Sequence, residues 1–156
     1  MTISAVEDWV EPPLRAFVGD ARVVLALLLN TSGQVLAQHG FTRAVDVMAA
    51  CALAAAIHAS GSELGRQLEG KPFSGLHHAG RERQIFLAEA PTPRGAYIFL
   101  TVFDRESSLG LVQLYFDEFK VRLAAAAPPK SEHKPALAEN FEGDLNKNLA
   151  ALFGRS

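Results

Sequence analysis

Cysteine is nearly absent from this chain: Cys51 is the only one in 156 residues, so no internal disulfide can form. Charge of one sign is lacking too. The formal net charge is −2 and the basic residues are scattered, which excludes the basic patch that nucleic acid or anionic membranes attract. The long uncharged run, residues 47–62, is too short to span a membrane, and the N-terminus has no signal-peptide pattern. We therefore expect a cytoplasmic protein with no nucleic-acid partner and no membrane insertion.

Motifs that carry catalysis or hold cofactors are also missing. The sequence has no P-loop GxxxxGK[ST], no GxGxxG after a strand, no GxSxG and no HExxH. His77 and His78 are adjacent in an expected strand, so their side chains point to opposite faces and cannot easily share a metal ion. Cys51 lies among alanines, without the polar neighbours that activate a thiol. We predict that the chain is not an enzyme and has no catalytic residue, no cofactor and no metal site.

What the chain does have is a sharp strand–turn–helix pattern over residues 96–123. Aromatic residues and Thr101 alternate with aliphatic residues over 97–103, so both faces of this strand are apolar, which is typical of a strand covered on both sides. Ser107-Ser108 then supplies a side-chain oxygen that can cap a helix, and Gly110 indicates a close approach to neighbouring backbone. One face of that helix is apolar through Leu109, Val112, Phe116, Phe119 and Leu123.

The rest of the chain predicts further elements in a simple order. A first helical turn or two is expected from Ile3, Val6, Trp9 and Val10, and Pro12-Pro13 interrupts or restarts that helix. Strands are expected over residues 23–29, 34–39, 73–79 and 83–90, with Gly33 at positive φ in the first hairpin turn, and a long helix capped by Thr42 over 43–68. Short connections make the sheet antiparallel.

The long helix is unusually rich in small residues, mostly alanine. Alanine is simply a good helix former, so the helix could pack on a sheet and nothing else. Small side chains on several sides also let a second helix come close, including one from another copy of the chain. The sequence leaves both interpretations open.

Three regions are expected: a domain over residues 1–123, a flexible linker over 124–140 rich in proline and charge, and a short C-terminal amphipathic helix over 141–156. A helix that short is marginal alone in water and needs a second surface. That surface could belong to its own domain or to a groove on a partner.

Three stretches resemble the roadblock family, and within it the MglB-like regulators of bacterial Ras-like GTPases. They are the strand–turn–strand VVLALLLNTSGQVLAQHG, the helix exit ELGRQLEGKPF and the closing LTVFDRESSLGLVQL. The resemblance covers about Leu14–Leu123. It implies an α+β fold: an α/β/α, roadblock/profilin-like sandwich with a five-stranded antiparallel sheet in the order helix–strand–strand–helix–strand–strand–strand–helix.

The resemblance also implies a function. Two copies would pair through the long helix and the neighbouring strand, and the homodimer would activate a small Ras-like, MglA-like GTPase by reorganising it, without donating an arginine finger. The implied dimer residues are Ala49, Leu53, Ala56, Phe73, Gly75 and His77. The implied partner-binding residues are Asp46, His58, Ser62, Arg66, Phe141, Leu145, Leu149, Leu152 and Phe153. Two alternatives remain: a non-catalytic scaffold subunit of a larger roadblock-containing complex, and a small-molecule sensor.

Overall fold

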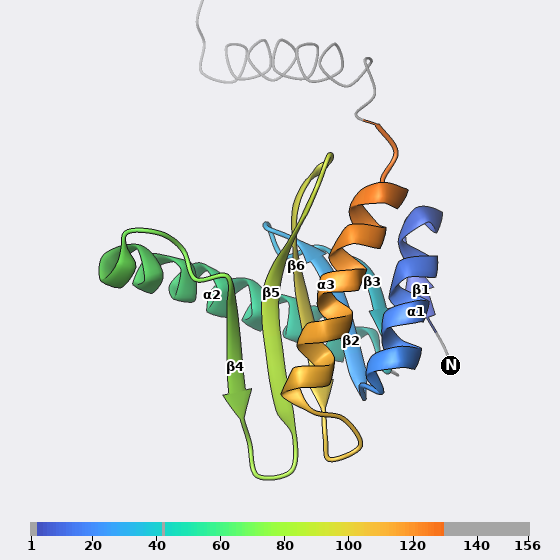
Figure 1. Cartoon of the computed structure of the whole chain (residues 1–156). Helices are drawn as coiled ribbons and strands as arrows, with labels where there is room; N and C mark the ends of the chain where they lie inside the picture. Colours follow the sequence, from blue (N-terminus) through green and yellow to red (C-terminus); the bar gives the residue numbers. More distant parts are fainter. Residues whose placement is uncertain (1–2, 42, 130–156) are drawn as a thin grey trace, which may run out of the picture.

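Ten elements make up the part of the chain that the computed structural model describes, residues 3–41 and 43–129 (Figure 1). In chain order they are β1 (Ile3–Ala5), a 3₁₀ turn (Asp8–Val10), α1 (Glu11–Ala21), β2 (Leu25–Asn30), β3 (Val35–His39), α2 (Ala44–Glu69), β4 (Gly75–Ala79), β5 (Gln84–Thr92), β6 (Gly95–Phe103) and α3 (Leu109–Ala126). All strand pairs are antiparallel, and the sheet order is β1-β3-β2-β6-β5-β4.

The sheet has six strands, so the expected five-stranded sheet was wrong. The extra strand is β1, which pairs with β3 from Ile3 opposite His39 to Ala5 opposite Ala37. We had predicted helical turns here from the apolar spacing. Instead the segment supplies β3 with a neighbour, and a 3₁₀ turn follows it. The proline pair then lies in the first turn of α1, where the missing N–H costs nothing, so the prediction of a restarted helix is confirmed.

Helices cover both faces of the sheet: α1 and α3 lie on one face and α2 on the other (Figure 1). The central strand β6 contributes to both cores, as its alternation predicted. Tyr97, Phe99 and Phe103 pack among α1 and α3, whereas Ile98 and Leu100 pack beneath α2. The α1/α3 core is dense in rings, and Phe99 lies 4.9 Å from Phe17 and 4.7 Å from Phe119 between ring centroids.

Helix α3 begins as predicted, because the Ser108 hydroxyl accepts a hydrogen bond from the Leu111 N–H at 3.1 Å. Its predicted apolar face is buried or partly buried. The prediction for Gly110 was wrong: a Cβ built there meets no atom within 4 Å. The helix continues to Ala126, three residues past its expected end.

The hairpin turn between β2 and β3 is held by Asn30, whose side-chain oxygen accepts hydrogen bonds from the N–H groups of Ser32 and Gln34 at 3.1 and 2.9 Å. Gly33 has a φ of 91°, which confirms the expected positive φ. The Thr42 cap lies outside the described residues. Arg43 occupies the cap position of α2 and makes no side-chain capping bond.

Two glycines set how closely α2 approaches the β4 side of the sheet. A Cβ on Gly61 would lie 2.7 Å from a methyl carbon of Leu76, and one on Gly65 would lie 2.6 Å from the main-chain nitrogen of Phe73. Both separations are shorter than real Cβ contacts. At Gly61 a movement of the Leu76 side chain could relieve the clash, whereas at Gly65 the main chain of the loop between α2 and β4 would have to shift. The C-terminal turns of α2 extend past β4 in Figure 1.

Candidate protein-interaction surface

The outer face of α2 is apolar and exposed. Large hydrophobic side chains project from it at Val45, Met48, Leu53, Leu64 and Leu68, and Met48 and Leu53 are 71% and 64% exposed. Alanines at positions 49, 52, 56 and 59 fill the space between them and are exposed too. Contiguous exposed apolar surface of this kind marks a site of interaction more often than it marks ordinary protein surface.

The inner face of α2 explains why the helix adopts this orientation. Val47, Cys51 and Ala54 are buried against β2, β5 and β6 in the second core cluster. Burial raises the pKa of the Cys51 thiol, because a thiolate is poorly solvated there. The thiol therefore stays protonated at neutral pH, and the interpretation of Cys51 as a small buried hydrophobe is confirmed.

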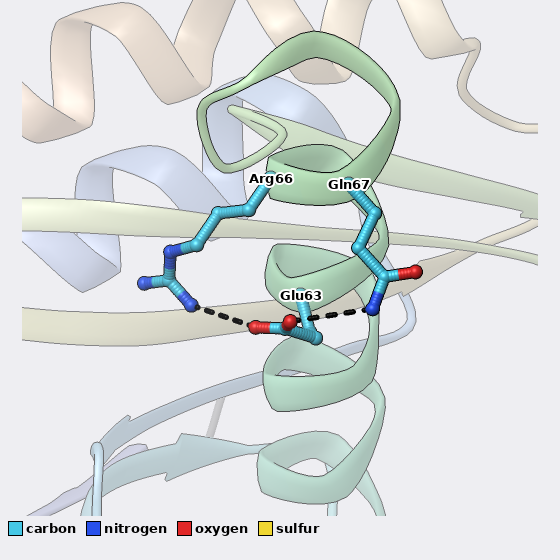
Figure 2. Close-up of polar contacts among 3 residues, drawn as sticks. All are labelled: Glu63, Arg66 and Gln67. Atoms are coloured by element: carbon cyan, nitrogen blue, oxygen red, sulfur yellow. Dashed lines mark hydrogen bonds and ion pairs between the residues drawn. The ribbon is translucent and has the colours of Figure 1, made fainter.

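A cluster of polar contacts lies toward the C-terminal end of α2 (Figure 2). The Glu63 carboxylate accepts a hydrogen bond from Arg66 and another from Gln67, each at 3.4 Å. All three residues are exposed, so the ion pair between Glu63 and Arg66 adds little stability. The outer face of α2 thus divides into an uncharged stretch over residues 48–60 and a charged end.

By length and composition alone, α2 also has the properties of a membrane-spanning helix over Val45–Glu69. A single helix of this kind is weak evidence of a membrane span; its inner face packs on the sheet, and 17% of its apolar stretch is buried.

Strand β4 forms one edge of the sheet, with β5 on its only paired side. Gly75, His77, His78 and Ala79 are all exposed. An open edge presents unpaired N–H and C=O groups that can pair with another strand. At the other edge β3 is covered by β1, and the Val6 N–H adds a hydrogen bond to the Leu36 carbonyl at 2.7 Å.

The residues predicted at the dimer interface fall on two neighbouring elements. Ala49, Leu53 and Ala56 are exposed on the outer face of α2. Gly75 and His77 lie on β4, and Phe73 lies half-buried just before it, next to Gly65. The structure does not bring the His77 ring to the α2 face: it lies on the α3 face, stacked on Phe103 with 6.2 Å between ring centroids.

The residues predicted to bind a partner are spread along α2. Asp46 and Arg66 are exposed at its two ends, and Asp46 forms an ion pair with Arg43 at 3.4 Å. His58 and Ser62 are half-buried, at the seam between α2 and residues 73–76. The other five, Phe141, Leu145, Leu149, Leu152 and Phe153, lie outside the described residues, as do most of the linker and the whole expected C-terminal helix.

Sequence reasoning missed two hollows and four side chains. One open hollow of about 500 Å³ lies between the β2–β3 turn and α2, bordered by Val35, Met48 and Cys51. Another, of about 330 Å³, lies between β4 and α3 and is bordered by His77, Phe116 and Lys120. The missed side chains, Val45, Met48, Leu64 and Leu68, follow the helical spacing of the outer face, which the abundance of alanine obscured.

The described part of this surface consists of apolar side chains and open main-chain groups. Within residues 3–41 and 43–129, no group of three or more His, Cys, Asp or Glu side chains could hold a metal ion. Over the same residues, every buried side-chain nitrogen and oxygen atom has a hydrogen-bond partner. What the surface offers is apolar area on α2 and main-chain groups on β4.

Solved structures identify the fold. The chain is similar to the gliding protein MglB from Thermus thermophilus, with a TM-score of 0.68 and 23% identity. The match covers 81% of this chain and 98% of the MglB chain. An MglB with a tetrameric arrangement matches 81% of this chain and 95% of its own, with a TM-score of 0.67 and 21% identity. A roadblock/LC7 domain from Streptomyces avermitilis matches 74% of this chain and 92% of its own, with a TM-score of 0.60 and 18% identity.

These likenesses give this chain a roadblock, MglB-like fold. No protein-family model matches the chain, and no curated protein matches it in sequence.

Proposed function

We propose that this chain is a cytoplasmic, homodimeric activator of a small Ras-like GTPase, of the MglA-like kind. The observation that carries the proposal is the exposed apolar face of α2 beside the open edge of β4, on an MglB-like fold. A monomer in water leaves both features unsatisfied, since apolar area gains free energy on burial and edge groups gain it on pairing.

Two different surfaces are needed for this function. The β4 edge and the C-terminal turns of α2, which extend past β4, suit a second copy of the chain. Strand β4 of one copy can continue the sheet of the other, while Leu64 and Leu68 become covered by the second copy. The uncharged stretch of α2, with Met48 and Leu53, then remains for the GTPase, so this proposal moves Leu53 from the dimer interface that the resemblance implies to the GTPase-binding surface. Self-association is consistent with the tetrameric arrangement of one MglB structure.

The mode of activation follows from the side chains that the surface offers. The exposed side chains of α2 over residues 48–60 are alanine, leucine, methionine and Ser60, and none of them is a cation that could stabilise charge on a transferring phosphate as an arginine finger does. We infer that this protein accelerates hydrolysis by holding the mobile switch segments of the GTPase in their competent arrangement. The catalytic groups would all belong to the GTPase.

The direct test measures GTP hydrolysis by the cognate small GTPase with and without this protein. We expect that Leu53→Asp reduces the stimulated rate at least about tenfold, because it places a charge in an interface that excludes water. Leu114→Asp is the matched control. Leu114 is 55% exposed on α3, on the opposite face of the sheet, so this change should leave the stimulation intact. Equal loss in both variants would contradict a role for α2.

The C-terminal segment has a test of its own. If Phe141, Leu145, Leu149, Leu152 and Phe153 form a second anchor on the GTPase, then removing residues 141–156 should weaken binding while light scattering still shows a dimer. Loss of the dimer on truncation would instead assign this segment to self-association.

A scaffold subunit of a larger roadblock-containing complex is the second candidate, since the same apolar surface could bind without changing a rate. It predicts that the GTPase binds, that Leu53→Asp abolishes binding, and that wild-type protein leaves GTP turnover unchanged.

A further inference from the structure

The hydrogen-bond pattern of the β4–β5 hairpin shows which groups of β4 face the open side. The Gly80 N–H donates to the Arg83 carbonyl at 2.8 Å, which closes the turn. Since bonded and non-bonded pairs alternate along an antiparallel ladder, the pairs His78–Ile85 and Leu76–Leu87 bond to β5. The main-chain groups of Gly75, His77 and Ala79 therefore point away from the sheet.

The outward main-chain groups of these three residues can pair with the same groups of a second copy related by a two-fold axis. If the axis passes through His77, Gly75 of one copy pairs with Ala79 of the other, and His77 pairs with His77 of the second copy. All three outward residues then exchange hydrogen bonds. A shift of the axis to Leu76 or His78 leaves only two of them paired, so the register centred on His77 is the most favourable.

We propose that two copies join in this register, so that two His77 side chains face each other across the axis and association weakens as pH falls. This inference rests on the homodimer proposed above. Bonded pairs in an antiparallel ladder have Cα atoms about 5.5 Å apart, with their side chains on one face of the sheet. The two imidazole rings would thus be direct neighbours on the α3 face.

Few other charges surround His77. Its Nε2 lies 2.7 Å from the side-chain oxygen of Gln84 on β5, and its ring stacks on Phe103 of β6. From α3, Asp117 and Lys120 border the same hollow, where they form an ion pair at 3.3 Å. The nearby carboxylate is therefore already matched by its own lysine, and the second copy brings the same set of groups.

Protonation changes the balance at this contact. Histidine side chains gain their charge between about pH 8 and pH 5, so two neutral rings become two like charges as the pH is lowered. Like charges directly opposite each other in a sheet are destabilising, and at about 6 Å with partial solvation the repulsion corresponds to roughly tenfold in a dissociation constant. Protons would thus release the two copies.

The test measures the dimer dissociation constant by analytical ultracentrifugation at about pH 7.5 and about pH 5.5. We expect the wild type to dissociate about tenfold more readily at the lower pH. His77→Phe keeps a ring against Phe103 without a charge, and should show little dependence on pH. His77→Lys should associate weakly at both values. His78→Phe, the same change on the neighbouring residue, should behave as the wild type does.

The outcomes separate this inference from the homodimer itself. A dimer with the same dependence on pH in wild type and His77→Phe, or with none in the wild type, overturns the role of His77 and leaves the homodimer standing. A monomer at both pH values overturns both. Circular dichroism at both pH values checks that each variant is folded.

Discussion

Replacing Phe99 by alanine is expected to destabilise the domain by about 3–5 kcal/mol. The ring is fully buried on the central strand and lies against rings of α1 and α3, with 4.9 Å between its centroid and that of Phe17 and 5.5 Å to Phe116. Truncation removes its buried area and leaves a cavity that rigid neighbours cannot fill. Urea unfolding followed by circular dichroism measures the loss.

The control for this change is Leu114→Ala, on the exposed face of α3. Because Leu114 is already 55% exposed, its truncation should change the free energy of unfolding by no more than about 0.5 kcal/mol. A small effect of Phe99→Ala would mean that the ring does not hold α1 and α3 on the sheet.

The second substitution with a large expected effect is Gly65→Ala, which should lower the free energy of unfolding of the domain by about 1–3 kcal/mol. The added methyl group would lie 2.6 Å from the Phe73 nitrogen and 2.8 Å from the Lys71 carbonyl oxygen. Both are main-chain atoms, so the loop that leads into β4 must move. The gain in helix propensity, about 1 kcal/mol, is too small to offset this clash. Thermal and urea unfolding both report the change.

The same substitution in α3 provides a control of opposite sign. At Gly110 the methyl group meets nothing within 4 Å, so Gly110→Ala should stabilise the domain by up to about 1 kcal/mol through helix propensity alone. If Gly65→Ala were also stabilising, the close approach of α2 to the loop before β4 would be contradicted. A dimer that weakens in Gly65→Ala would further link this approach to the position of β4.

The sequence predicted an element correctly where its apolar pattern extended over many residues, as it does over 97–103 and from Leu109 to Leu123. The alternation over residues 97–103 predicted a strand with two apolar faces, and β6 contributes buried side chains to both cores, as β2 and β5 also do. The spacing from Leu109 to Leu123 likewise predicted the buried face of α3, and the pair Ser107-Ser108 predicted its start, where the structure shows Ser108 as the cap. These signals are local, so neighbours elsewhere in the chain could not override them.

The wrong predictions share a physical origin: each depended on contacts between residues that are far apart in the sequence. Three residues, Ile3–Ala5, carry too short a pattern to distinguish strand from helix, and only their pairing with β3 makes them a strand. Gly110 was interpreted as a contact point, yet it faces open space. Among the glycines of α2, Gly61 and Gly65 make close approaches, and their neighbours come from the loop and strand that follow the helix.

The candidate surface was predictable in part. Ala49, Leu53 and Ala56 were named together at the dimer interface that the resemblance implies, and the structure shows them exposed on the outer side of α2. The large side chains beside them were missed, because which side of an apolar helix faces the sheet depends on packing and not on composition. The side of the sheet on which His77 lies was equally inaccessible until its neighbours were known.

Strand β1 limits how far such a molecule can grow. In each copy the three-residue strand β1 forms one edge of the sheet and β4 forms the other. Joining two β4 edges gives a continuous sheet of twelve strands, twice the six of one copy, with the short strand β1 at both outer edges. A three-residue edge offers few main-chain groups to a further copy, so growth by strand addition stops at the pair, whereas two long open edges in every copy would permit a fibre of indefinite length.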